Sequence, residues 1–419
     1  MSLGPITSYS IPFKVPGSQQ DRQKLHFFCV QGVSDLSGNL CGSTHFWRGT
    51  ALESSHEEPV VRQALTAFSS AHLDFLRAKS DERVEDFVSV DTIRAYHKAL
   101  RCLRRYLASR NDSKTPFSLK VPLICCAFFY CFESTRSNYA VALSHLDNGL
   151  AILRSHNSKD TDMSVDVDLS SVSHLFSRLD LQATLANPSR IPTLEITTEA
   201  ERSGLTPIIP EDYSFPGGTA EAQVTLDKLQ NYAWRFLVGS YCHGFSTQVP
   251  PEVLQEKADL KSQFSRWDAA LDRLCAARAQ KAPHTKPDLV SGPVYNEVVT
   301  LLRISHRSTL MALDSILPAD SSVFSAIPNP QGNEILTFVE SLQLTDLGKR
   351  AFSAEVGALA PLSMLAQYCA DPAVAGRARE LLRGARRREG FVDCRFGPAE
   401  PCERWKQESR GRWVSRWLY

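Results

Sequence analysis

The densest group of reactive side chains is the set of three cysteines in PLICCAFFYCFE, residues 122–133. Thiolates can hold zinc or carry out redox chemistry. On a helix, however, successive residues turn by about 100°, so Cys125 and Cys126 lie roughly a quarter turn apart and Cys131 points away from both. Thiols that diverge in this way cannot meet at one ion. Because the neighbours are apolar on every side, we interpret the stretch as a buried helix in which cysteine packs as a small hydrophobic residue.

Other motifs that could carry catalysis are incomplete. His56-Glu57 lacks the second histidine of a zinc protease, since Val60 stands at that position. GSYCHG at 239–244 lacks the central serine of a nucleophile elbow. Gly348-Lys349 has neither the upstream glycine nor the following Ser or Thr of a phosphate loop. Hydrogen-bonded structural roles are expected for the histidines within helices, namely His72, His97 and His145. We therefore predict a protein that is not an enzyme, with no catalytic residue, no metal site and no cofactor.

Bulk composition narrows the class of protein. The chain has 419 residues, of which 43% are hydrophobic and 22% charged, as in ordinary globular proteins. Its 47 Lys and Arg nearly balance its 46 Asp and Glu, so no net field attracts nucleic acid or an anionic membrane. Eleven cysteines without framework spacing indicate reduced thiols inside the cell. No secretory signal is recognised in MSLGPITSYS, and the longest apolar run, Val121 to Phe132, is too short to span a membrane.

Hydrophobic spacing predicts helices along most of the chain and no sheet-based core, so the predicted fold class is all-α. From Pro59 to Leu76 and from Val90 to Leu107, apolar residues recur every three or four positions. The second of these helices carries a basic face on its other side. Further helices are expected at 122–133, 138–154, 169–186, 221–240, 251–280, 294–317, 333–344, 352–370 and 372–388.

The predicted helices are separated by long loops, several of them rich in proline and glycine. These loops span residues 157–168, 187–218, 281–293 and 318–332. One segment resembles a tetratricopeptide hairpin, but nothing recurs at a period of about 34 residues. The expected architecture is therefore an irregular helical domain rather than a repeat solenoid.

The C-terminal part of the chain is basic. Residues 376–419 contain 12 Lys or Arg against 6 Asp or Glu. Arginines alternate with tryptophans in its last segment, at Arg404, Trp405, Arg412, Trp413, Arg416 and Trp417. This pattern suits a platform for stacking nucleic-acid bases, but we favour a terminal helix that docks its tryptophans on the core. Arg386 to Arg388, followed by Gly390, are predicted to form the C-terminal end of a helix.

Several blocks in order resemble one family. RQKLHFFCVQGVSDLSGNL and HFWRGTALESSHEEPVVRQALTAFSSAHL contain Trp47 and the Ser-His-x-Glu-Pro motif at Ser55 to Pro59. FSRLDLQATL at 176–185 follows, and GALAPLSMLAQYCADPAVAGRARELLRGARRREGFVDC supplies Pro-Leu, Cys-x-Asp-Pro and Arg-Arg-Glu-Gly elements near the end. From about residue 24 to 394, these blocks resemble the regulatory (middle homology) domain of fungal zinc binuclear cluster transcription factors.

The resemblance implies an all-helical regulatory domain over residues 25–394, with an N-terminal tail at 1–24 and a basic, Trp-rich segment at 395–419. Members of that family usually also carry six closely spaced cysteines that hold two zinc ions and read DNA. The printed sequence has no such cluster, and its first cysteine is Cys29. We therefore expect only indirect contact with DNA and assign no DNA-binding residue.

Three hypotheses follow from these observations. The first is a nuclear transcription regulator that acts through protein partners, either an intact zinc-cluster factor or a second copy of the chain, and controls a biosynthetic gene cluster. The second is a ligand-binding or catalytic accessory protein of a biosynthetic pathway. The third is a truncated gene model whose upstream exon encodes the zinc cluster. A small-molecule effector in an apolar cavity is a further expectation, since 21 phenylalanines are available to line one.

Overall fold

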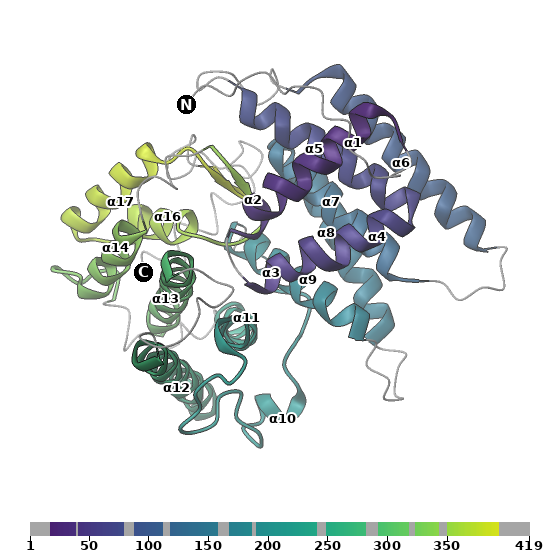
Figure 1. The fold of residues 1–419 in the computed structure, drawn as a ribbon. Helices are drawn as coiled ribbons and strands as arrows, with labels where there is room; N and C mark the ends of the chain where they lie inside the picture. Colours follow the sequence, from purple (N-terminus) through teal and green to yellow (C-terminus); the bar gives the residue numbers. More distant parts are fainter. Residues whose placement is uncertain are drawn as a thin grey trace.

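In the computed structural model, residues 17–38, 41–78, 88–111, 118–157, 167–186, 190–240, 249–281, 292–317, 323–342 and 350–393 are described. Almost all regular structure in these ranges is helical, so the predicted fold class is confirmed. The helices from α1 to α9 lie together on one side, and α11 to α17 lie on the other (Figure 1). The division of the chain into domains at residues 24 and 394 stays a prediction.

The first hydrophobic core is built around α7, Lys120–Thr135, which is buried along nearly its whole length. Its mean hydropathy is high and its apolar residues surround the helix, so it must be covered on all sides. The covering helices are α5 (Pro59–Arg77), α6 (Val90–Asn111), α8 (Tyr139–Asn157) and α9 (Val167–Ala186). Trp47, part of the motif noted above, is fully buried and packs against Phe128 of α7.

Short helices precede these long ones. They are α1 (Gln19–Phe27), α2 (Val33–Ser37), α3 (Cys41–His45) and α4 (Leu52–Glu57), with wider π-type turns at Phe28–Gly32 and Phe46–Ala51. The Ser-His-x-Glu-Pro motif ends α4 and starts α5, with Pro59 in the first turn, where its missing N–H removes no helical hydrogen bond. Arg62 reinforces this junction because its Nη1 donates to the carbonyl of Ser55 at 3.0 Å.

A second core holds α11 (Gly218–Gly239), α12 (Pro251–Lys281) and α13 (Gly292–Asp314) together. At its centre the buried Trp267 of α12 stacks on His306 of α13. The loop before α11 contains the short helix α10, Glu199–Arg202. A third core joins α13 to α14 (Pro330–Ser341), α16 (Leu359–Tyr368) and α17 (Pro372–Gly384).

A small sheet connects the third core with the first. Strand β1 (Phe352–Ser353) pairs in parallel with β2 (Arg388–Glu389), which pairs antiparallel with β3 (Val392–Asp393). Phe352 is fully buried in the first core. The chain thus returns from its C-terminal helices to pack on its N-terminal ones.

Two predicted helices were wrong at the ends that contribute to this sheet. The helix expected at 352–370 begins only at Leu359, because Phe352 and Ser353 pair with β2. The helix expected at 372–388 ends at Gly384. The remaining long helices match their predicted positions to within a few residues. Within the described residues, no helix is both long and apolar enough to cross a membrane.

Candidate functional site

A buried polar cluster lies where four segments that are distant in the sequence meet. We call it the Arg178 junction, and it consists of Arg178, Asp227, Glu355 and Ser43 of α3. Arg178 comes from α9, Asp227 from α11, and Glu355 from the loop after β1. The Arg178 side chain is 7% exposed and uses all three guanidinium nitrogens. Its Nε donates to Glu355 Oε2 at 2.9 Å and its Nη1 to Asp227 Oδ2 at 3.1 Å. Its Nη2 donates to Ser43 Oγ at 2.8 Å, and the Ser43 hydroxyl donates to the other oxygen of Glu355.

The charges at the junction do not cancel, because one guanidinium faces two carboxyl groups. Burial raises the pKa of Asp227, and the nearby charge of Glu355 raises it further. Arg178 opposes both effects, and the resulting pKa of Asp227 is about 7. Burial also raises the pKa of Glu355 above its ordinary value, against the opposing effects of Arg178 and Ser43. Two carboxylates in a region of low dielectric cannot both ionise beside a single cation without cost. The junction therefore holds a proton below about pH 7.

Next to the junction, Asp180 of α9 anchors the linker that leads to α11. The Asp180 side chain is fully buried. Its Oδ2 accepts hydrogen bonds from the backbone N–H of Thr193 at 2.5 Å and of Leu194 at 3.0 Å. Its Oδ1 accepts from Arg190, whose Nη2 lies 2.8 Å away. A buried carboxylate that accepts several hydrogen bonds fixes the backbone conformation of the linker at this point.

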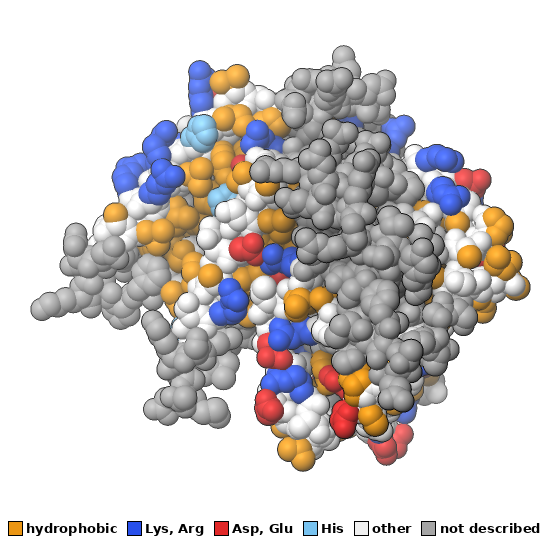
Figure 2. Space-filling model, turned by 180° about the vertical axis from the view of Figure 1, so that it is seen from behind, with side chains coloured by type: hydrophobic (Ala, Val, Ile, Leu, Met, Phe, Trp, Pro, Cys, Tyr) orange, Lys and Arg blue, Asp and Glu red, His pale blue; other side chains and the backbone are white. Residues whose placement is uncertain are grey.

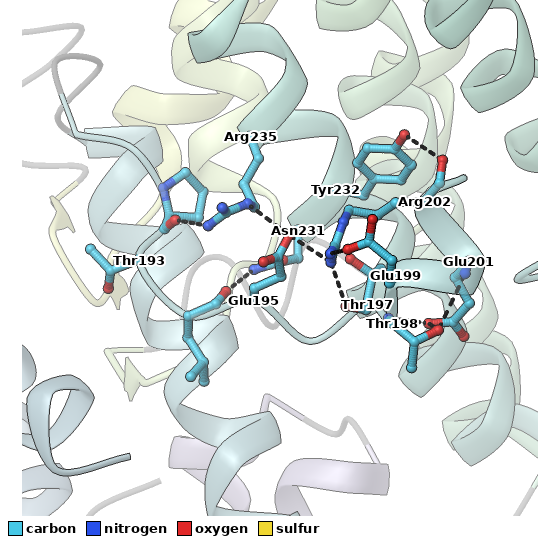
Figure 3. Close-up of polar contacts among 12 residues, drawn as sticks. Thr193, Glu195, Thr197, Thr198, Glu199, Glu201, Arg202, Asn231, Tyr232 and Arg235 are labelled. Atoms are coloured by element: carbon cyan, nitrogen blue, oxygen red, sulfur yellow. Dashed lines mark hydrogen bonds and ion pairs between the residues drawn. The ribbon is translucent and has the colours of Figure 1, made fainter. Parts of the chain in front are cut away.

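The linker then runs along α11, where side chains of the helix bind its backbone (Figure 3). Asn231 Nδ2 donates to the Leu194 carbonyl at 2.8 Å, and Arg235 Nη1 donates to the Pro192 carbonyl at 2.7 Å. Glu195 lies 2.8 Å from Arg202 and 3.6 Å from Arg235. We call residues 190–202 the linker strap. It is held to α9 by a buried carboxylate and to α11 by an amide and a guanidinium.

A capping box starts α10 at the end of the strap. The Thr198 hydroxyl accepts from the Glu201 N–H at 3.2 Å, and Glu201 accepts in return from the Thr198 N–H at 2.7 Å. Glu201 also pairs with Lys228 of α11 at 2.8 Å. The pKa of Glu201 is lowered despite partial burial, because Lys228 and Thr198 hydrogen-bond to its charged form.

Arg388 forms a second buried charged contact between distant segments, and it corrects a prediction. Arg386 to Arg388 do not end a helix, since α17 stops at Gly384 and Arg388 lies in β2. Arg388 is fully buried and donates through Nη1 to the carbonyls of Ser134, at 2.9 Å, and Thr135. These carbonyls end α7, so the arginine stabilises the C-terminus of another helix. Gly390 is not a helix cap but the turn between β2 and β3, with a φ of +51°.

The three cysteines of α7 lie in the first core, so the prediction that this helix is buried is confirmed. Cys125 and Cys131 are fully buried, and Cys126 is nearly so. Burial raises the pKa of each thiol, to about 12 for Cys126, so all three are protonated at neutral pH. Thiols in that state are poor nucleophiles and poor metal ligands. The described residues hold no group of His, Cys, Asp and Glu arranged to bind a metal; the absence of zinc from the purified chain stays a prediction.

The other candidate residues are scattered. His56 and Glu57 are exposed on α4. His72 is buried with its Nε2 at 3.2 Å from Asp35. His97 is exposed on α6, whereas His145 of α8 lies 2.8 Å from the hydroxyl of Tyr96. Most of the 239–244 motif, Gly348-Lys349 and the arginine-tryptophan segment lie outside the described residues.

No catalytic or binding motif contains Arg178 or Asp180, but the sequence does carry a signal for both residues. In FSRLDLQATL, Arg178 and Asp180 are the only charged residues, and they alternate with leucines in a predicted helix. Charged side chains at such positions are rarely fully buried unless they are paired. That pattern predicts partners for both residues, but Asp227 and Glu355 are too far away in the sequence to be identified from it.

Comparisons with known proteins agree with this architecture. Residues 25–236 match the fungal specific transcription factor domain. Ser43, Arg178 and Asp227 fall inside the matched residues, whereas Glu355 lies beyond them. The chain is also similar to the aspercryptin biosynthesis cluster-specific transcription regulator atnN of Emericella nidulans. The two are 24% identical over 280 residues, which cover 62% of this chain and 41% of the relative. The chain thus spans about two fifths of the relative's length.

No solved structure matches the chain. The domain match, however, covers half of the 419 residues and includes every helix from α2 to α10. The chain therefore belongs to the family of proteins with a fungal specific transcription factor domain.

Proposed function

We propose that the chain is a nuclear transcription regulator that controls a biosynthetic gene cluster through protein partners. The observation that carries the proposal is the domain match over residues 25–236. This family is typically not enzymatic, and nuclear action is inferred from the family. Control of a biosynthetic cluster is supported by the similarity to the cluster-specific regulator of Emericella nidulans.

Action through partners is supported by the charge of the chain and by its motifs. A net charge of +1 gives little long-range attraction to DNA, and the 419 residues contain no CxxC pattern. On this proposal, the 419-residue chain reaches a promoter through a second protein. The partner is either a DNA-binding factor or a second copy of the chain bound to one.

The Arg178 junction and the linker strap give this proposal a structural basis. They hold α9 and α11, both at least partly inside the matched residues, against the loop after β1 in the C-terminal part of the chain. A regulatory domain that presents surfaces to other proteins must keep its helices in a fixed arrangement. The buried contacts supply that arrangement.

A tethering assay in fungal cells tests the proposed function. The 419-residue chain is fused to a DNA-binding domain of unrelated origin, and a reporter with matching sites is measured. The expected result is a several-fold change in reporter transcription relative to the DNA-binding domain alone. Reporter levels identical to that control, with the fusion present in the nucleus at equal amount, would contradict the proposal.

A further inference from the structure

The outer face of α6 carries a row of exposed cations. Arg94, Lys98, Arg101 and Arg105 are spaced by four, three and four residues, so they follow one side of the helix over three turns. All four are exposed, and exposed Arg104 lies at the edge of the row. The opposite side of α6 packs on the first core through residues such as Tyr96 and Ala99.

Few acidic side chains balance this row. Asp91 pairs with Arg94 at 3.0 Å, and both side chains are largely exposed. Within the part of the chain that the structure describes, no ion pair is formed by Lys98, Arg101 or Arg105. Cations three and four residues apart repel one another and destabilise a helix. The row therefore does not serve the stability of α6, which points to a role in binding.

Apolar side chains accompany the cations. Figure 2 shows Lys and Arg side chains gathered on the side of the molecule where α6 lies, next to hydrophobic and histidine side chains. Leu107 of α6, which is 38% exposed, lies three residues and about one turn beyond Arg104, at the edge of the row. A ligand that fits this surface offers negative charge together with apolar groups.

We propose that this α6 face, defined by Arg94, Lys98, Arg101, Arg104, Arg105 and Leu107, binds an acidic segment of a partner protein in which Asp and Glu alternate with hydrophobic residues. Charge complementarity selects the acidic groups, and the exposed Leu107 beside Arg104 selects a protein segment over a phosphate backbone. The inference rests on the proposed function, because it names the chemistry of the partner through which the regulator acts.

Peptide binding to the purified full chain tests the proposal. The probe is a fluorescein-labelled 20-residue peptide in which Asp and Glu alternate with Leu and Phe. A second peptide has Asn and Gln in place of the acids, and a labelled 20-base-pair duplex represents nucleic acid. We expect the acidic peptide to bind at low salt, with a Kd that rises several-fold between about 50 and 200 mM salt. The neutral peptide is expected to bind at least tenfold more weakly.

Two matched variants locate the site. Arg101→Gln combined with Arg105→Gln removes two exposed charges from the α6 face. Arg383→Gln combined with Arg386→Gln removes two exposed charges from the region of α17. The α6 variant should raise the Kd of the acidic peptide about tenfold, whereas the control variant should change it less than twofold. Circular dichroism and thermal unfolding verify that both variants fold like the parent chain.

Four outcomes would overturn the proposal. The first is an equal rise in the Kd of the acidic peptide in both variants, and the second is no binding of that peptide. The third is tighter binding of the duplex than of the peptide, with the same dependence on Arg101 and Arg105, and the fourth is loss of dimerisation in the α6 variant without any effect on peptide binding. The third would make the face a nucleic-acid interface, and the fourth would make it an interface between copies of the chain.

The tethered reporter separates failure of this inference from failure of the proposed function. If the parent chain changes transcription and the α6 variant does so equally well, binding of the partner at the α6 face is contradicted but the proposed function is supported. If the parent chain has no effect on the reporter while the acidic peptide still binds the α6 face, the proposed function is contradicted but the peptide-binding site is supported.

Discussion

Arg178 and Glu355 are 177 residues apart in the sequence, and their side chains form a buried ion pair with 2.9 Å between Nε and Oε2. This contact fastens the loop after β1 to α9. Asp227 completes the cluster from α11. Three segments that share no local sequence relationship are therefore held by one guanidinium.

Replacement of Arg178 by Met should destabilise the chain strongly. The variant would leave two buried carboxyl groups without their cation, and loss of one partner from a buried pair typically costs about 3–5 kcal/mol. Chemical denaturation followed by circular dichroism measures the free energy of unfolding. As a control, Arg94→Met removes an exposed arginine and should change that free energy by less than about 0.5 kcal/mol. Equal effects of the two substitutions would show that the junction contributes nothing.

Replacement of Asp227 by Asn should change how stability depends on pH. The pKa of Asp227 is raised to about 7, so between pH 4 and 7 the folded chain keeps a proton that the unfolded carboxyl group releases. In this window, ionisation of Asp227 makes the free energy of unfolding of the parent chain fall as pH rises, by at most about 1.4 kcal/mol per pH unit. Asn carries no titrating group. The free energy of unfolding of the variant, minus that of the parent, should therefore increase from pH 4 to pH 7 and level off above it. A difference that stays constant over this range would disprove the assigned ionisation.

Acid should destabilise the parent chain through three histidines. Burial lowers the pKa of His145, His174 and His306 to about 4, with Arg178 and Lys228 adding to the effect at His174. Between about pH 6.5 and pH 4 the unfolded chain binds protons at these groups and the folded chain does not. The free energy of unfolding should therefore fall as pH falls through this window, because three such groups outweigh the opposing effects of Asp227 and Glu355. Thermal unfolding at half-unit pH intervals measures it; a midpoint that rises on acidification would contradict the expectation.

Much of this architecture is visible in the sequence, and the reason is physical. Helices such as α5 and α7 have a periodic or continuous apolar pattern that local spacing fully specifies. The strands were missed because each has only two residues, too few for alternation to appear. The pairing of Phe352 with Arg388 depends on segments 36 residues apart. Likewise, the charge of Arg178 in a mostly uncharged helix could have been noticed, but its partners are set by the tertiary fold.

Substitutions at Cys131 distinguish a packing role from a chemical one. Cys131 is fully buried, so Asp at this position would place an unpaired carboxyl group in the first core and should cost several kcal/mol. Ala should cost far less, since it removes only one sulfur atom. Unfolding free energies of both variants give the comparison, and elemental analysis of the parent chain should find no stoichiometric zinc. One or more zinc ions per chain would contradict the packing role.

Duplex DNA should bind the isolated chain weakly and without sequence preference. The chain has a net charge of +1, and the described helices include no recognisable reading motif. Anisotropy titrations with random and promoter duplexes at physiological salt measure the affinity. Sequence-selective binding at nanomolar concentration by the purified chain alone would show direct reading of DNA.

The central claim is that the chain regulates transcription of a biosynthetic gene cluster, and transcript profiling after deletion of its gene tests it most directly. RNA is sequenced from the parent fungus, the deletion strain and a strain in which the 419-residue chain is restored. The account predicts that transcripts of a contiguous set of biosynthetic genes change about tenfold or more on deletion and return on restoration. Unchanged transcripts in a strain that has lost the pathway product would contradict it and would indicate an accessory protein of the pathway instead.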